Sequence, residues 1–371
     1  MSDRGAYRNA GVDYAVLDEG KRSALAAAAS TSSFMSVLGG ASRDESRGEP
    51  AFVFNLGGKT LALVVEGLGT KSVAAREIQE EIGENHFHAV AYDSVAAVLN
   101  DLICVGALPL VLNAYFATGL SDWYSDHTRY NALLEGWTQA CVDASCTWGG
   151  GESPTLPGLV TPGEIELAGA AVGLVPDNRP AVLGQELKHG DEIVIVSSSG
   201  MHANGASLAR SVAAKAADGW STRLPDGRQL SEAIMAPSLL YVQLVRNLYE
   251  ANLDVHYLSH ITGHGLQKIM RPQQRFTYRL TALPPVPSEL AFLADASEMN
   301  ARDAYSTLNM GCGMAVYVPA GTGNQVVAEA ARLNYQAIVA GTVEDGDRQV
   351  ILEPLSVIYS DEDMSLTAAA K

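Results

Sequence analysis

The chain has 371 residues, of which 47% are hydrophobic and 18% charged, and its formal net charge at pH 7 is −17. This length is sufficient for two domains with separate hydrophobic cores. The negative charge argues against a nucleic-acid partner, because affinity for duplexes comes mainly from Lys and Arg side chains that neutralise phosphates. It is compatible with a nucleotide ligand, which a magnesium ion and a few backbone N–H groups can hold in an acidic protein.

A membrane or secreted protein is also disfavoured. No apolar run approaches the roughly 18 residues of a transmembrane helix. The Ala-rich run at 24–29 follows several acidic residues, and we interpret it as a buried helix rather than the core of a signal peptide. The four cysteines show no CxxC spacing, which predicts reduced thiols in a cytoplasmic protein and disfavours a zinc site.

The first half alternates strand and helix patterns. Two β-rich runs in 51–66 flank Gly57 and Gly58, which can adopt the positive φ angles of a tight turn, so a β-hairpin is predicted. Apolar spacing then predicts a helix at 92–106, a strand at 109–117, a helix at 130–144 that the segment 147–151 ends, and a strand at 164–174.

The second half begins after a polar segment with two prolines at 175–180, and we place a domain boundary there, giving domains 1–177 and 178–371. A buried-type strand at 191–198 leads into a polar glycine loop, and a helix begins near Ala206; this order suits anion binding. A second glycine loop at 260–265 also precedes a helical stretch. The last strand pair is predicted at 313–318 and 335–341.

The first candidate site is the segment 66–71 (EGLGTK), which follows a predicted strand. Its glycines allow the backbone to approach a ligand, and Lys71 can reach a phosphate as a point charge. The alternative is a tight turn with a solvated lysine.

Asp93, Asn100 and Asp101 lie on or beside one predicted helix. The two aspartates share a face about 12 Å apart, so they suit two magnesium ions between polyphosphate oxygens better than one ion. Asp93 can alternatively cap the helix. That alternative does not account for Asp101 in an apolar run, where an unpaired charge is costly.

Two further motifs are polar and rich in glycine. In 149–153 (GGGES), Glu152 follows three glycines whose ordering costs much entropy. The loop 198–205 offers serine hydroxyls, His202 and Asn204 around exposed N–H groups. Each motif is compatible with a functional or a structural role.

Together, these motifs resemble those of the aminoimidazole ribonucleotide synthetase family in order and spacing. The resemblance extends over almost the whole chain, and eight collinear matches carry it. These are YRNAGVD (7–13), EGLGTK (66–71), NDLICVGALP (100–109), YFATG (115–119), GGESPTLPG (150–158), SSGMHANGASL (198–208), HITGHG (260–265) and NMGCGM (309–314).

The resemblance implies two α+β domains and a homodimer in which the N-terminal sheets pair into a barrel. It implies ATP-dependent ring closure of formylglycinamidine ribonucleotide to aminoimidazole ribonucleotide, with release of ADP and phosphate. ATP and Mg²⁺ are the implied cofactors. In such a reaction the protein mainly positions the reactants and neutralises charge.

The resemblance also implies site residues. Lys71, Asp101 and His202 are the catalytic candidates, and Asp93, Asp101 and Glu152 the magnesium candidates. The residues implied in binding ATP or substrate are Glu66, Gly67, Gly69, Thr70, Lys71, Asn100, Gly150, Gly151, Glu152, Ser199, Asn204, His260, Thr262 and Asn309.

The chain departs from the family pattern at Glu66 (usually Asp), His264 (Gly), Ala203 (Ser) and Pro154-Thr155 (AE). Two alternatives therefore stay open. One is a related ATP-using enzyme that acts on another amide-type substrate. The other is a catalytically silent paralogue that binds nucleotide or a partner protein.

Overall fold

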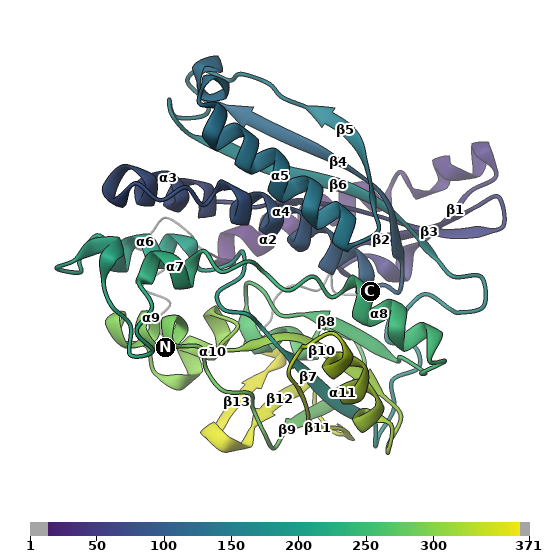
Figure 1. Cartoon of the computed structure of the whole chain (residues 1–371). Coiled ribbons are helices and arrows are strands. Elements are labelled where there is room, and N and C mark those ends of the chain that lie inside the picture. Colours follow the sequence, from purple (N-terminus) through teal and green to yellow (C-terminus); the bar gives the residue numbers. More distant parts are fainter. Residues whose placement is uncertain (1–13, 364–371) are drawn as a thin grey trace.

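A computed structural model describes residues 14–363, and the chain folds as two α+β halves, each built on one sheet (Figure 1). This agrees with the predicted fold class. The YRNAGVD motif at 7–13 lies outside the described residues.

The first sheet has the strand order β1-β2-β3-β6-β4-β5. Neighbouring strands are antiparallel except β4 and β5, which are parallel. The predicted hairpin is confirmed as β2 and β3, with the turn at Gly57 and Gly58, both at positive φ. The strands are β1 (Ala41–Arg43), β2 (Phe52–Leu56), β3 (Lys59–Gly67), β4 (Leu108–Thr118), β5 (Thr147–Glu152) and β6 (Ile165–Val175).

One helix, α4, lies between the first sheet and the second half of the chain. It contacts β3 and β6 on one side and β8 and α8 on the other. Most of its side chains are buried, including the polar side chains of Asp93, Asn100 and Asp101. The helices of this half are α2 (Tyr14–Ala29), α3 (Lys71–Ile82), α4 (Phe87–Ile103) and α5 (His127–Asp143).

The second sheet has the order β13-β12-β9-β11-β7-β10-β8, with only β9 and β12 parallel. The predicted strand at 191–198 is confirmed as β7. The strands are β7 (Glu192–Ser197), β8 (Tyr257–His260), β9 (Phe276–Leu280), β10 (Cys312–Val318), β11 (Ala337–Asp345), β12 (Gln349–Leu352) and β13 (Val357–Ser360). The helices are α6 (Ala206–Ala213), α7 (Leu230–Ile234), α8 (Val242–Glu250), α9 (Ser288–Ala296), α10 (Ala301–Thr307) and α11 (Gly323–Arg332), with the 3₁₀ helix η5 (Gly265–Met270).

Three local predictions differ from the structure. The last predicted strand pair is not a pair, because β10 and β11 flank β7, and β12 and β13 follow them. The glycine segment that ends the helix of 130–144 is itself the edge strand β5. Residues 24–29 are helical but not buried, since Ala24 and Ala26–Ala29 are exposed. Alanine periodicity predicts a helix here, but it does not specify a packing partner.

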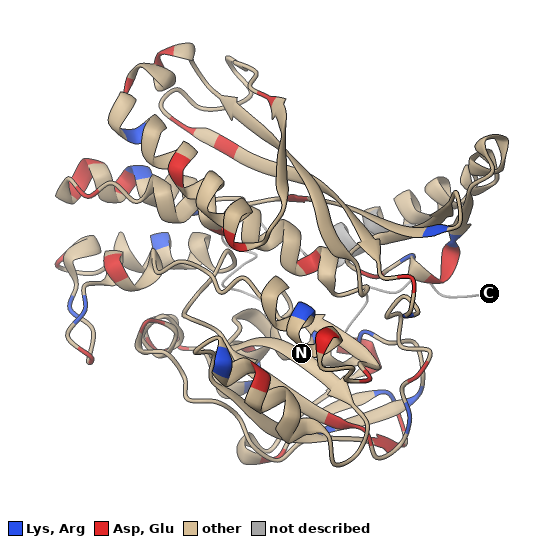
Figure 2. Ribbon diagram, turned by 45° about the vertical axis from the view of Figure 1, so that its right-hand side comes forward, with Lys and Arg blue, Asp and Glu red and all other residues tan. Residues whose placement is uncertain are grey.

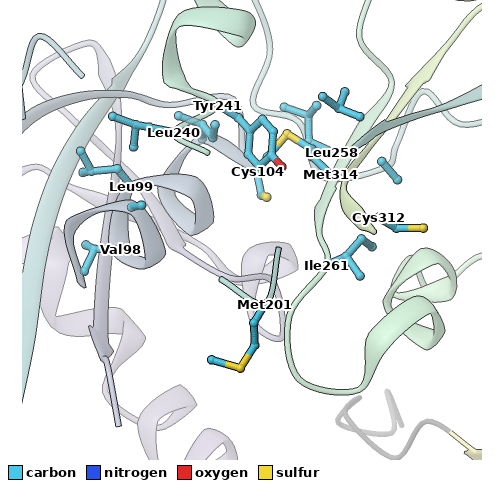
Figure 3. Close-up of a cluster of buried hydrophobic side chains, with 14 of the residues drawn as sticks. Val98, Leu99, Cys104, Met201, Leu240, Tyr241, Leu258, Ile261, Cys312 and Met314 are labelled. Atoms are coloured by element: carbon cyan, nitrogen blue, oxygen red, sulfur yellow. The ribbon is translucent and has the colours of Figure 1, made fainter. Parts of the chain in front are cut away.

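The two halves share one continuous core. Figure 3 shows Cys104 of the first half in one buried cluster with Leu240, Tyr241, Leu258 and Met314 of the second half. All five are essentially excluded from solvent. Because burial of apolar surface is the main stabilising term in folding, this core holds the halves in a defined relative position.

The cysteines agree with the prediction of reduced thiols: Cys104, Cys141, Cys146 and Cys312 are buried and free. Within residues 14–363, no helix combines the length and the hydropathy needed to cross a bilayer. Red segments outnumber blue ones in Figure 2, in line with the net charge.

Candidate functional site

The site is built on the face of α4 that meets the second half. Asn100 lies at this junction with both ends of its amide hydrogen-bonded: Nδ2 donates to the carbonyl of Leu239 at 2.9 Å, and Oδ1 accepts from the N–H of Tyr241 at 2.9 Å. The polar residues that the sequence places inside an apolar run are therefore directed at the other half of the chain. Asn100 therefore links the two halves, and its role in binding a ligand stays a prediction.

Lys71 and Asp93 form an ion pair that is completely buried, with both side chains 0% exposed. The ammonium of Lys71 also donates to the carbonyl of His202 at 2.8 Å, and the second oxygen of Asp93 accepts from the N–H of Ser238 at 2.7 Å. Asp93 lies in the second turn of α4, so it is not the N-cap residue. The pair joins α3 and α4 to two loops of the second half.

Asp101 and His260 meet across the same junction, with Oδ1 of Asp101 2.7 Å from Nδ1 of His260. Burial raises the pKa of Asp101, but His260, Lys268 and Arg271 outweigh it and hold the pKa below its ordinary value. Asp101 is therefore a carboxylate at neutral pH. It is the predicted metal ligand best placed to act with His260, which comes from the second glycine loop.

Two cations near this carboxylate were missed from the sequence. Lys268 lies in η5 with only 8% of its surface exposed, and its ammonium donates to Thr262 Oγ1. Arg271 follows η5 directly and acts electrostatically on both Asp101 and Lys268. The signal that could have found them is a pair of basic residues directly after a glycine loop.

The loop 198–205 is held by Asn309. Its Nδ2 donates to the carbonyls of Gly200 and Met201 at 2.9 and 3.1 Å, and its Oδ1 accepts from Ser198 at 3.0 Å. Ser199 donates its hydroxyl to the carbonyl of Pro237 at 2.6 Å. Asn309 is thus a positioning residue for the loop, whose Asn204 is exposed.

His202 lies in the left-handed region at φ 61° and is 3% exposed. Its Nε2 accepts from the N–H of Ser199 at 3.1 Å. Burial, together with His260 and Lys71, lowers the pKa of His202 well below its ordinary value. The ring is therefore neutral at physiological pH.

This pKa predicts a loss of stability in acid. In the unfolded chain the ring binds a proton once the pH falls below about 6.5, while in the folded chain it stays neutral, so unfolding becomes easier as the pH falls. We expect the free energy of unfolding to fall less between about pH 7.5 and 5.5 in His202→Asn than in the parent. Asn tolerates the left-handed backbone. The exposed His189→Asn is the control. An equal fall in both variants would contradict the assignment.

The loop before α3 also contacts the second half. Thr70 Oγ1 lies 2.8 Å from Ser207 Oγ at the start of α6. Gly69 has φ 75°, which only a residue without a Cβ adopts freely, and Gly67 is exposed. Glu66 acts electrostatically on Lys268. The first predicted motif therefore lies at the same junction as Asp101.

Glu152 lies apart from this cluster. Glu66 and Gly151 are at the same level of the first sheet, but β6 and β4 lie between their strands. Three strand spacings separate them by roughly 14 Å. A Cβ at Gly151 would lie 2.1 Å from the carbonyl of Ala114, so close packing of β5 on β4 explains this glycine. Glu152 itself is exposed.

The predicted magnesium ligands are therefore not gathered in one place. Asp93 is engaged with Lys71, Asp101 with His260, and Glu152 lies on the edge strand. Across residues 14–363, no group of three or more His, Cys, Asp or Glu side chains could hold a metal ion. A single carboxylate, that of Asp101, is compatible with a magnesium ion whose other ligands are phosphate oxygens and water. The assignment of these ligands stays a prediction.

Comparison with known proteins identifies the family. Models of the AIR synthase related protein match residues 48–175 with the N-terminal domain and 188–353 with the C-terminal domain. The phosphoribosylformylglycinamidine cyclo-ligase of Parasynechococcus marenigrum is 34% identical over 76% of this chain and 81% of its own length. The chain belongs to the aminoimidazole ribonucleotide synthetase family. A second family member, the cyclo-ligase of Symbiobacterium thermophilum, is 35% identical over 77% of this chain and 81% of its own.

Solved structures agree on the fold of the family. Hydrogenase maturation protein HypE in complex with ATP superposes with a TM-score of 0.59 and 18% identity, over 81% of this chain and 83% of that one. Thiamine-monophosphate kinase from Stenotrophomonas maltophilia superposes with a TM-score of 0.55 and 16% identity, over 82% of this chain and 90% of that one. At these identities the likeness shows the two-domain fold alone.

Proposed function

We propose that the protein closes the imidazole ring of aminoimidazole ribonucleotide. ATP phosphorylates the formyl amide oxygen of formylglycinamidine ribonucleotide, which turns a poor leaving group into phosphate and releases ADP. The amidine nitrogen attacks the activated carbon, and the ring closes as phosphate leaves. The observation that carries the proposal is the match to cyclo-ligases over most of their length.

The test is a turnover assay on the purified chain with ATP, magnesium and formylglycinamidine ribonucleotide. We expect one ADP and one phosphate for each imidazole formed, and little ADP without the substrate. If ADP formed only with another amide-type substrate, the related-enzyme alternative would hold. Nucleotide binding without any turnover would indicate a silent paralogue.

We assign the nucleotide to the junction of the two halves. The backbone of 67–70 and the loops 198–205 and 260–265 meet there, and Asp101 supplies a carboxylate for magnesium. We assign Lys71, Asp93, Asn100 and Asn309 to positioning, because their polar atoms are engaged within the protein. Glu152 lies too far away to join this site from the same chain.

We propose that two chains pair through the first sheet to form a barrel. Side chains of β3 alternate between the two faces: Ala62 and Val64 are buried, whereas Leu63 and Val65 are 45% and 71% exposed. Leu110 of β4 adds to the exposed apolar face, and the strands of this sheet are almost entirely tan in Figure 2. Exposed apolar patches of this kind mark interaction surfaces.

Val65→Asp should therefore convert the dimer to a monomer, because a carboxylate would be buried without a partner in the interface. Sedimentation equilibrium at micromolar concentration measures the mass. Ile358→Asp is a matched control, since Ile358 is 51% exposed on the second sheet and should leave the dimer intact. If the parent protein sedimented as a monomer, the proposed dimer would be contradicted.

We keep the domain boundary at residues 177 and 178. The first sheet ends at Val175 with β6, the second starts at Glu192 with β7, and the family models end and begin at 175 and 188. We place the enzyme in the cytoplasm, where its four free cysteines stay reduced.

A further inference from the structure

Within residues 14–363, Lys268 and Arg271 are two neighbouring cations that form no close ion pair with an acidic side chain. The ammonium of Lys268 donates to Thr262 Oγ1, and the buried Nε of Arg271 makes no hydrogen bond within residues 14–363. No Asp or Glu oxygen of the described chain lies within the 4.0 Å of an ion pair from either cation. Lys71, the other buried lysine, differs because it is paired with Asp93.

The nearest acids are occupied elsewhere. Asp101 is bonded to His260, and Glu49 accepts from the hydroxyl of Tyr257 at 2.7 Å. Each acts on Arg271 at longer range, and together with Tyr257 they raise the pKa of Arg271 despite its burial, whereas the pKa of Lys268 is lowered. Lys268 is buried and Arg271 is partly buried, and neighbouring like charges that are withdrawn from water cost free energy unless an opposite charge compensates them. A bound anion would supply that charge.

The pKa of Lys268 also indicates that its charge is incompletely compensated within the protein. Burial, reinforced by Arg271, lowers its pKa to about 8, although Asp101 and Glu66 act to raise it. A bound anion would act in the opposite direction to Arg271 and stabilise the ammonium. Thr262 can take part as well, since its oxygen accepts from Lys268 and its own hydrogen stays available.

We propose that Lys268, Arg271 and Thr262 form a subsite for a phosphate group at the junction of the two halves. The inference rests on the proposed function and deepens it. Lysine supplies a point charge, and the guanidinium fork of arginine matches the oxygens of a phosphate. The group is either the phosphoryl of ATP that is transferred or the 5′-phosphate of the ribonucleotide.

Binding measurements on Lys268→Met test the subsite without requiring turnover. A non-hydrolysable ATP analogue, formylglycinamidine ribonucleotide and inorganic phosphate are titrated separately by calorimetry. We expect the affinity for one of the first two to fall about 10- to 100-fold, as for the loss of a charge-assisted hydrogen bond. The ligand affected identifies which phosphate binds. Lys188→Met, which removes an exposed lysine of the same half, should change none of the affinities.

Stability separates this role from a structural one. Without ligand, Lys268→Met should be as stable as the parent or more stable, because a buried unpaired charge is removed. Lys268→Arg keeps the charge and should recover part of the affinity. Unchanged affinity for all three ligands in a folded Lys268→Met protein would overturn the subsite. If the parent binds phosphate ligands through Lys268 but forms no imidazole, the proposed function fails and the subsite stands.

Discussion

Asp101→Asn should lower the rate of substrate-dependent ATP turnover by about 10²- to 10³-fold, since in the proposed site it removes the charge that would hold magnesium against the phosphates. The two side chains have the same volume, and Asn can still hydrogen-bond to His260, which lies 2.7 Å from the carboxylate. The fold should therefore persist. Turnover is measured as ADP released at saturating ATP and substrate, and circular dichroism checks the fold.

The matched control is Asp177→Asn, which removes a carboxylate that pairs with Lys59 on the surface. It should turn over ATP at the parental rate. If Asp101→Asn also did so, Asp101 would not be the magnesium ligand. A loss of ATP turnover accompanied by unfolding would instead indicate that Asp101 mainly supports the junction with His260.

Lys71→Met should destabilise the protein by about 3–5 kcal/mol, because Asp93 would remain buried and charged without its partner. Both side chains are fully buried, and together they bond to two loops of the second half. Denaturant unfolding measures the loss. Combining Lys71→Met with Asp93→Leu should recover most of it, since an apolar pair can replace a buried ion pair.

Lys59→Met is the control for this prediction. Lys59 also pairs with an aspartate, but both side chains are at least half exposed. Breaking an exposed pair costs about 1 kcal/mol or less. If Lys71→Met were no more destabilising than Lys59→Met yet abolished ATP binding, Lys71 would contact the phosphates directly, and its positioning role would be wrong.

Several elements of the fold could be predicted because their signals are local. The hairpin around Gly57 and Gly58 requires positive φ angles, and apolar residues at helical spacing define most of α4. Strand pairing was harder. The sequence predicts the strands β10 and β11, but it does not predict that each of them pairs with β7. Strands that are neighbours in a sheet can lie far apart in the sequence, so local patterns do not identify the partner.

In the candidate site, too, some features can be predicted from the sequence and others cannot. Motif order alone indicated Asp101 and His260, 159 positions apart in the sequence, and the structure places them in contact. Lys71 and Asp93 are also candidate site residues, but the sequence does not predict that they form an ion pair with each other. Lys268 and Arg271 are not predicted from the sequence, because a basic residue after a loop is ordinarily solvated; only the folded chain shows that Lys268 is buried and that the Nε atom of Arg271 has no hydrogen-bond partner within residues 14–363.

The family, the two α+β halves and the glycine loops can be predicted without a structure, because motif order and hydrophobic periodicity are properties of the chain. Tertiary structure decided how the polar residues are used. Packing of α4 between the two halves buries Asp93 and Asp101 almost equally, with 0% and 8% exposed. Their neighbours then differ: a lysine neutralises Asp93, whereas Asp101 lies beside a histidine and two cations. Because charge interactions depend on distance and burial, chemically identical carboxylates acquire different roles only in the folded chain.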